Sequence, residues 1–80
     1  MRIEYTSGPA KTIIDEARRL NASVVSVQSY WTFVNFNNRD DAERFVESMR
    51  MTERVELGFG GEINTKRPFT PFEVLVRVKG

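Results

Sequence analysis

The reactive side chains of this chain are limited to carboxylates, hydroxyls and basic groups, because its 80 residues contain neither cysteine nor histidine. This composition excludes disulfides, thiolate or imidazole metal sites and the usual general base at neutral pH. Two carboxylate pairs remain, Asp40 with Asp41 and Glu43 with Glu47, but helix-start acids and a solvated helix face explain both. We therefore predict no catalytic residue, no metal site and no cofactor, and a protein that is not an enzyme.

The glycine-rich stretch Leu57-Gly58-Phe59-Gly60-Gly61 has the composition of a phosphate-binding loop. Such a loop must lead into the N-terminus of a helix, and residues 62–71 have no helical pattern. A hairpin turn or bulge is the better interpretation. The basic pair Lys66-Arg67 lies in the following loop, where we expect it to be solvated.

The segment from Tyr30 to Phe36 concentrates four aromatic side chains in seven residues and includes the only tryptophan of the chain. A small core can be filled with Val, Ile and Leu, so this concentration raises the prospect of a binding surface. The segment alternates as a strand does, and successive side chains of a strand point to opposite faces. One face then carries Thr32, Val34 and Phe36, and the other carries Trp31, Phe33 and Asn35.

Periodicity predicts the elements that must position these aromatic residues. Alternating residues indicate strands, and apolar residues at helical spacing indicate two amphipathic helices. Ser7-Gly8-Pro9 is typical of a helix start, and residues 37–41 supply an Asn cap with first-turn carboxylates. We predict helices over residues 10–20 and 42–49, a loop over 60–71, and strands over residues 2–6, 23–28, 30–36, 55–59 and 72–79.

This order is β-α-β-β-α-β with an extra C-terminal strand or an inserted hairpin, and it predicts a single α+β domain over residues 1–80. The expected architecture is a ferredoxin-like sandwich, in which both helices cover one face of an antiparallel sheet and leave the other face open. Either residues 55–59 or residues 72–79 would then form the fourth strand.

Charge and hydropathy say less about partners. No apolar stretch approaches about 18 residues and the first residues do not resemble a secretion signal, so we expect a cytoplasmic protein without a membrane partner. The net charge of +1 neither predicts nor excludes a polyanionic partner. Positive charge is concentrated near the C-terminal end, at Lys66, Arg67, Arg77 and Lys79.

The run Ser29-Tyr30-Trp31-Thr32-Phe33-Val34-Asn35-Phe36, with Ala42 and Met49 on the helix that follows, resembles the RNA recognition motif family over residues 23–49. In that family two aromatic side chains on the open sheet face stack on bases, a role that would fall to Trp31 and Phe33. The chain departs from the family pattern in lacking the basic residue and the glycine before Trp31. It also has Glu4 on the first strand, where the family usually has another stacking aromatic.

The resemblance implies a small non-catalytic domain that binds single-stranded nucleic acid on its open sheet, with RNA favoured and DNA as the other option. The expected binding residues are Trp31 and Phe33 against bases, Asn35 and Gln28 at base edges, and Arg2, Arg77 and Lys79 at phosphates.

An alternative from another class is a protein–protein interaction module. The sheet or an edge strand would then dock a protein partner or form a homodimer, for example as a small inhibitor of the phage-encoded anti-defence or anti-CRISPR type. Trp31 and Phe33 would be covered by the extra strand, a partner subunit or the loop over residues 60–71.

Overall fold

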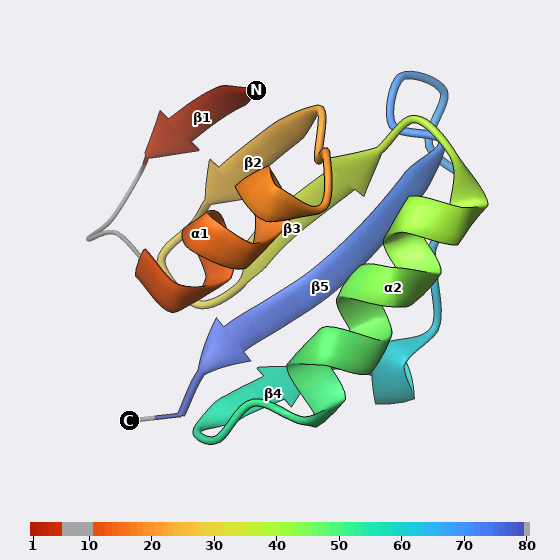
Figure 1. Cartoon of the computed structure of the whole chain (residues 1–80). Coiled ribbons are helices and arrows are strands. Elements are labelled where there is room, and N and C mark those ends of the chain that lie inside the picture. The colour runs from red at the N-terminus through yellow and green to blue at the C-terminus, as the bar shows by residue number, and fades with distance from the viewer. Residues whose placement is uncertain (6–10, 80) are drawn as a thin grey trace.

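The computed structural model describes residues 1–5 and 11–79, and the predicted helix start at Ser7-Gly8-Pro9 lies outside these ranges. The described part of the chain forms an α+β domain with two α-helices and five strands (Figure 1). The elements in chain order are β1 (Arg2–Tyr5), α1 (Lys11–Arg19), β2 (Val24–Val27), β3 (Thr32–Phe36), α2 (Arg39–Arg50), β4 (Val55–Leu57), the 3-10 turn η1 (Gly58–Gly61) and β5 (Phe72–Val78).

The sheet is mixed, which corrects the prediction of an antiparallel sheet. Its strand order is β1-β2-β3-β5-β4, and β1 is parallel to β2 while the other neighbouring pairs are antiparallel. The physical reason is the crossover through α1, which brings β2 back beside β1 in the same direction. The ferredoxin-like order is not confirmed, because that split βαβ arrangement separates the two parallel strands and here they are neighbours.

Both C-terminal candidates for the fourth strand are strands. β5 pairs with the whole of β3, and β4 then pairs with β5 at the edge of the described sheet, so the two form an inserted hairpin. Phe59, which was predicted to continue the strand over residues 55–59, instead lies in η1 with a φ of 51°. The strand ends at Leu57 because the chain turns through the glycines that follow it.

Both helices cover the same face of the sheet, as predicted (Figure 1). The core lies between these two layers. The strand register places the core valines of neighbouring strands opposite one another, with Val25 opposite Val34 and Val34 opposite Val74. All three side chains are fully buried. The helices complete the core with Ile13, Ile14, Ala17, Ala42, Phe45, Val46 and Met49.

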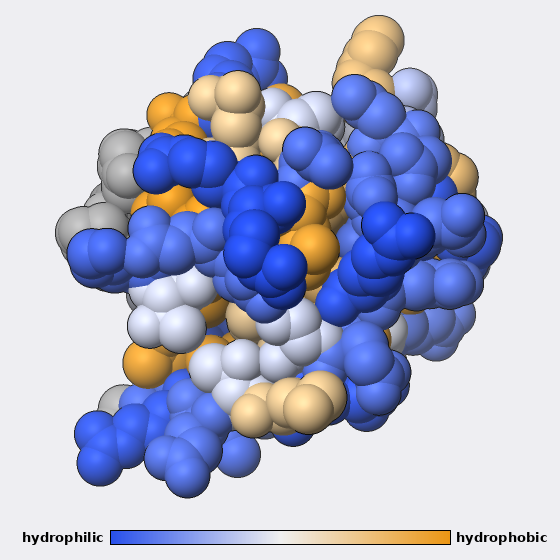
Figure 2. Space-filling model, in the orientation of Figure 1, coloured by the Kyte–Doolittle hydropathy of each residue, from blue (hydrophilic) through white to orange (hydrophobic). Residues whose placement is uncertain are grey.

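The outer surface of the helix layer is mainly hydrophilic, with apolar atoms in the gaps between polar side chains and a few apolar groups that protrude at its periphery (Figure 2). The predicted cap of α2 is confirmed, since the Asn38 side chain accepts a hydrogen bond of 2.9 Å from the backbone N–H of Asp41. This surface is therefore that of an ordinary solvated helix layer.

A carboxylate on α1 connects the two helices. Glu16 accepts hydrogen bonds from Arg19 Nε at 2.5 Å and Nη2 at 2.8 Å, and it also accepts one from the Ser48 hydroxyl on α2. The hydrogen bonds from Arg19 and then from Ser48 lower the pKa of Glu16 to about 2. The charged form of this carboxylate is thus favoured by the folded state.

We expect Glu16→Gln to lower the free energy of unfolding by about 1 kcal/mol at neutral pH, because it removes charge-assisted hydrogen bonds. The folded-state pKa is depressed, so this contribution is present above the usual value of 4.5 and is lost as the pH falls towards 2. Urea unfolding followed by circular dichroism at several pH values checks this. The difference from wild type should shrink in acid, and Glu43→Gln, at an exposed site on α2, should show no such trend. An equal loss at every pH would contradict the assignment.

Candidate nucleic-acid interface

The face of the sheet opposite the helices carries rows of side chains that run across the strands. They arise because every second residue of a strand points to this face, and the register aligns them from strand to strand. The rows are Arg2, Val24, Asn35 and Glu73; then Ser26, Phe33 and Leu75; then Gln28, Trp31, Arg77 and Glu56.

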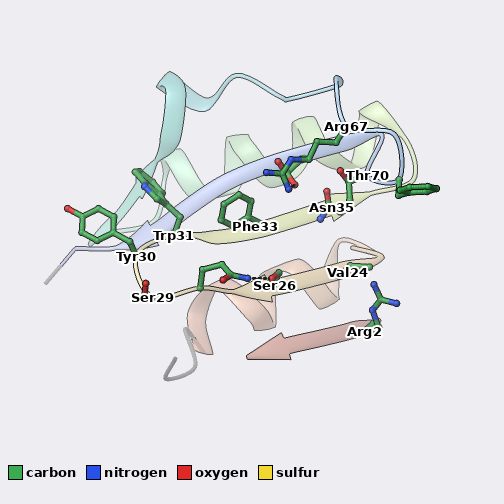
Figure 3. Close-up of a pocket in the computed structure, with 13 residues that line it drawn as sticks. Arg2, Val24, Ser26, Ser29, Tyr30, Trp31, Phe33, Asn35, Arg67 and Thr70 are labelled. Atoms are coloured by element: carbon green, nitrogen blue, oxygen red, sulfur yellow. Dashed lines mark hydrogen bonds and ion pairs between the residues drawn. The ribbon is translucent and has the colours of Figure 1, made fainter. Parts of the chain in front are cut away.

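A groove with a volume of about 590 Å³ crosses this face over β2 and β3 (Figure 3). Its size lies within the range of small-ligand sites. The predicted separation of the two faces of β3 is confirmed, since Thr32, Val34 and Phe36 are buried and the alternating set lines the groove. The groove brings together five predicted site residues, namely Arg2, Gln28, Trp31, Phe33 and Asn35.

The two aromatic side chains predicted to stack are neither fully buried nor fully exposed. Trp31 and Phe33 are each half-buried, whereas Asn35, in the same set, is only 4% exposed. The loop over residues 60–71 therefore covers part of this face, but it leaves aromatic surface accessible in the groove.

Arg77 and Lys79 line a second, smaller hollow beside the groove, together with Tyr30. The Arg77 guanidinium donates to Glu56 at 2.7 and 2.8 Å and lies 4.7 Å from the centre of the Tyr30 ring and 4.8 Å from that of Trp31. Hydrogen bonding to Glu56 raises the pKa of Arg77 above its ordinary value. Arg77 is thus fixed against the aromatic rings, while Lys79 is exposed.

The loop after η1 contributes residues that sequence reasoning missed. The Arg67 side chain extends from this loop over the sheet (Figure 3), and its Cζ atom lies 5.4 Å from the centre of the Phe33 ring. Its Nη1 atom lies 3.5 Å from Glu73 Oε2. Phe69, which is 94% exposed, and Thr70 complete the wall of the groove. No local pattern distinguishes Arg67 from a solvated basic residue, because its partners are set by tertiary contacts.

The floor below Arg67 holds polar atoms whose hydrogen bonding is incomplete. Glu73 is 1% exposed, and Asn64 Nδ2 donates to its Oε1 at the long distance of 3.3 Å. Asn35 Oδ1 and Thr70 Oγ1 are buried and have no hydrogen-bond partner within the described residues. Buried polar atoms of this kind are uncommon and call for an explanation.

Gly58 allows Trp31 to lie close to the sheet. A Cβ atom at this position would lie 2.8 Å from Leu75 Cβ and 3.4 Å from Trp31 Cζ3. Real Cβ atoms do not approach to the shorter of these distances, so a larger residue forces η1 and β5 apart, and this moves η1 relative to the indole that it contacts.

We expect Gly58→Ala to destabilise the fold by about 1–3 kcal/mol through this overpacking and to shift the fluorescence of Trp31. Gly60→Ala is the matched control, because its added Cβ meets nothing within 4 Å and its cost comes from a φ of +65°. It should destabilise by about 1–2 kcal/mol without moving the emission maximum. The same spectral shift in both variants would show that Gly58 does not position the indole.

Among the described residues, neither helix is long and apolar enough to cross a membrane, and no three or more Asp, Glu, His or Cys side chains form a cluster that could hold a metal ion. No family model, curated protein or solved structure matches this chain.

Proposed function

We propose that this domain is a non-catalytic module that binds single-stranded nucleic acid, RNA in particular, across the open face of its sheet. The observation that carries the proposal is the groove itself, whose lining combines two half-buried aromatic side chains, Trp31 and Phe33, with the guanidinium groups of Arg2 and Arg67. Aromatic faces combined with cations are the features by which proteins bind single strands.

The spacing of the two aromatic residues suits successive nucleotides. Trp31 and Phe33 are two residues apart on the same face, which corresponds to about 6.6 Å along a strand. Each ring then stacks on one base, and such a stack contributes about 1–3 kcal/mol whichever base it is. Gln28, whose amide donates to Ser26 at 2.6 Å at the border of the groove, is placed to meet a base edge.

The charges around the groove favour weak binding. Arg2 and Lys79 are exposed at its periphery, but Arg77 is paired with Glu56, and Glu73 lies in the floor. A few phosphate contacts on a nearly neutral protein give a shallow dependence on salt, since each contact contributes about −0.7 to the slope of log affinity against log salt for single strands. Two contacts, by Arg2 and Lys79, predict a slope of about −1.4, and a third contact by Arg77, which would have to leave Glu56, brings the slope to about −2.

A second candidate function is the docking of a protein, including a second copy of this chain or the target of a small inhibitor. It is favoured by three aromatic side chains that are strongly exposed, Tyr30 at 67%, Phe59 at 79% and Phe69 at 94%. Exposed apolar groups on a small domain mark interaction surfaces. Light scattering coupled to size-exclusion chromatography distinguishes a dimer from a monomer.

We expect Trp31→Ala to weaken binding of a labelled single-stranded RNA about tenfold, because it removes one stacking surface. Lys66→Ala is the control: it removes a basic side chain that lies outside the groove, in the loop over residues 60–71, and binding should change less than twofold. Fluorescence anisotropy at several salt concentrations gives both affinities and the slope. Equal and negligible losses in the two variants, or no binding by the wild type at low salt, would refute the proposal.

A further inference from the structure

Several hydrogen-bonding groups at the Glu73 end of the groove are incompletely satisfied. Glu73 brings two carboxylate oxygens, and neither the Asn35 Oδ1 acceptor nor the Thr70 hydroxyl has a partner within the described structure. Against them stand the Asn64 amide at 3.3 Å and the Arg67 guanidinium at 3.5 Å. Both distances lie at or beyond the long end of hydrogen bonding. A ligand that brings N–H donors would therefore give the Glu73 carboxylate shorter hydrogen bonds than it has now.

Arg67 shows which shape of ligand the site accommodates. Its guanidinium is a planar group with N–H donors along its edges, and it lies 5.4 Å from the centre of the Phe33 ring while one nitrogen approaches Glu73. It therefore combines contact with an aromatic face and a long ion pair with a carboxylate. Arg67 is also 57% exposed on its side chain and is carried by a loop, so another planar group can replace it.

Among nucleobases, guanine presents this combination most fully. Its Watson–Crick edge carries the adjacent donors N1–H and N2–H₂, which match the two oxygens of a carboxylate. Adenine and cytosine each offer a single amino group on that edge, and uracil places two carbonyl oxygens beside its one N–H. Those carbonyls would face Glu73 and Asn35, and a buried acceptor left unpaired disfavours binding.

We propose that the Phe33–Glu73 end of the groove is a guanine-selective subsite, which rests on the proposed binding of single-stranded nucleic acid. The base displaces the Arg67 guanidinium, stacks on Phe33 and donates its two N–H groups to the Glu73 carboxylate. Phe33 and Glu73 are close enough for this, because Phe33 lies diagonally across from Glu73 on the paired strands β3 and β5. Trp31 stacks on a neighbouring base without selecting it.

The test compares RNA heptamers that differ at one position: seven uridines, and the same strand with a central guanosine, inosine or adenosine. Anisotropy with labelled oligonucleotides should give about tenfold tighter binding for guanosine than for uridine. Inosine, which lacks the 2-amino donor, should fall between them. Glu73→Gln should reduce the preference for guanosine to less than twofold, by weakening binding of the guanosine strand and by giving the uracil carbonyls an amide donor, while Glu56→Gln, at the other end of the face, should keep the preference.

A second variant keeps the test decisive if Glu73→Gln fails to fold. Arg67→Ala removes the competing group from Phe33 and should strengthen binding of the guanosine strand relative to the uridine strand by several fold. Equal binding of all heptamers by the wild type would overturn the subsite and leave the proposed function standing. Absence of binding to every heptamer would refute both. Tighter binding of an arginine-containing peptide at this site than of the guanosine strand would also overturn the subsite, in favour of a protein ligand.

Discussion

The position of β3 between β2 and β5 is the constraint on which the rest of the structure depends. A strand hydrogen-bonded on both edges must send alternate side chains to opposite faces, so Val34 enters the core and its neighbour Phe33 cannot. The helices cover the first face only. The aromatic residues of β3 are therefore divided between a packed interior, which holds Phe36, and a groove, which holds Phe33.

The loop after η1 determines how much of that second face stays accessible. It returns to the sheet at Asn64, whose backbone makes two hydrogen bonds with Glu73, and then carries Arg67 over Phe33. This cover buries Glu73 and Asn35 on a face that is otherwise open. As a result, several buried polar atoms are left with long hydrogen bonds or with none. Proteins retain such energetically unfavourable groups mainly at functional sites.

The two arginines on this face are held very differently. Arg77 lies on a strand, and its short ion pair with Glu56 at 2.7 Å keeps it between Tyr30 and Trp31. Arg67 lies on a loop, and its contact with Glu73 is 3.5 Å long. Because short bonds to a rigid strand resist displacement more than a long contact from a loop, Arg77 is held more firmly than Arg67.

The sequence by itself determined the type and order of the helices and strands and the two faces of β3, because these follow from local periodicity and capping, as at Asn38, but it did not determine where each element ends, as at Phe59. It also identified Trp31, Phe33 and Asn35 as residues of one surface. Only the tertiary structure decided that β1 lies beside β2, that β5 lies beside β3, and that Arg67 rests on Phe33 over Glu73. These arrangements depend on pairing between segments far apart in the chain, and no local pattern encodes which distant strand or loop supplies the partner.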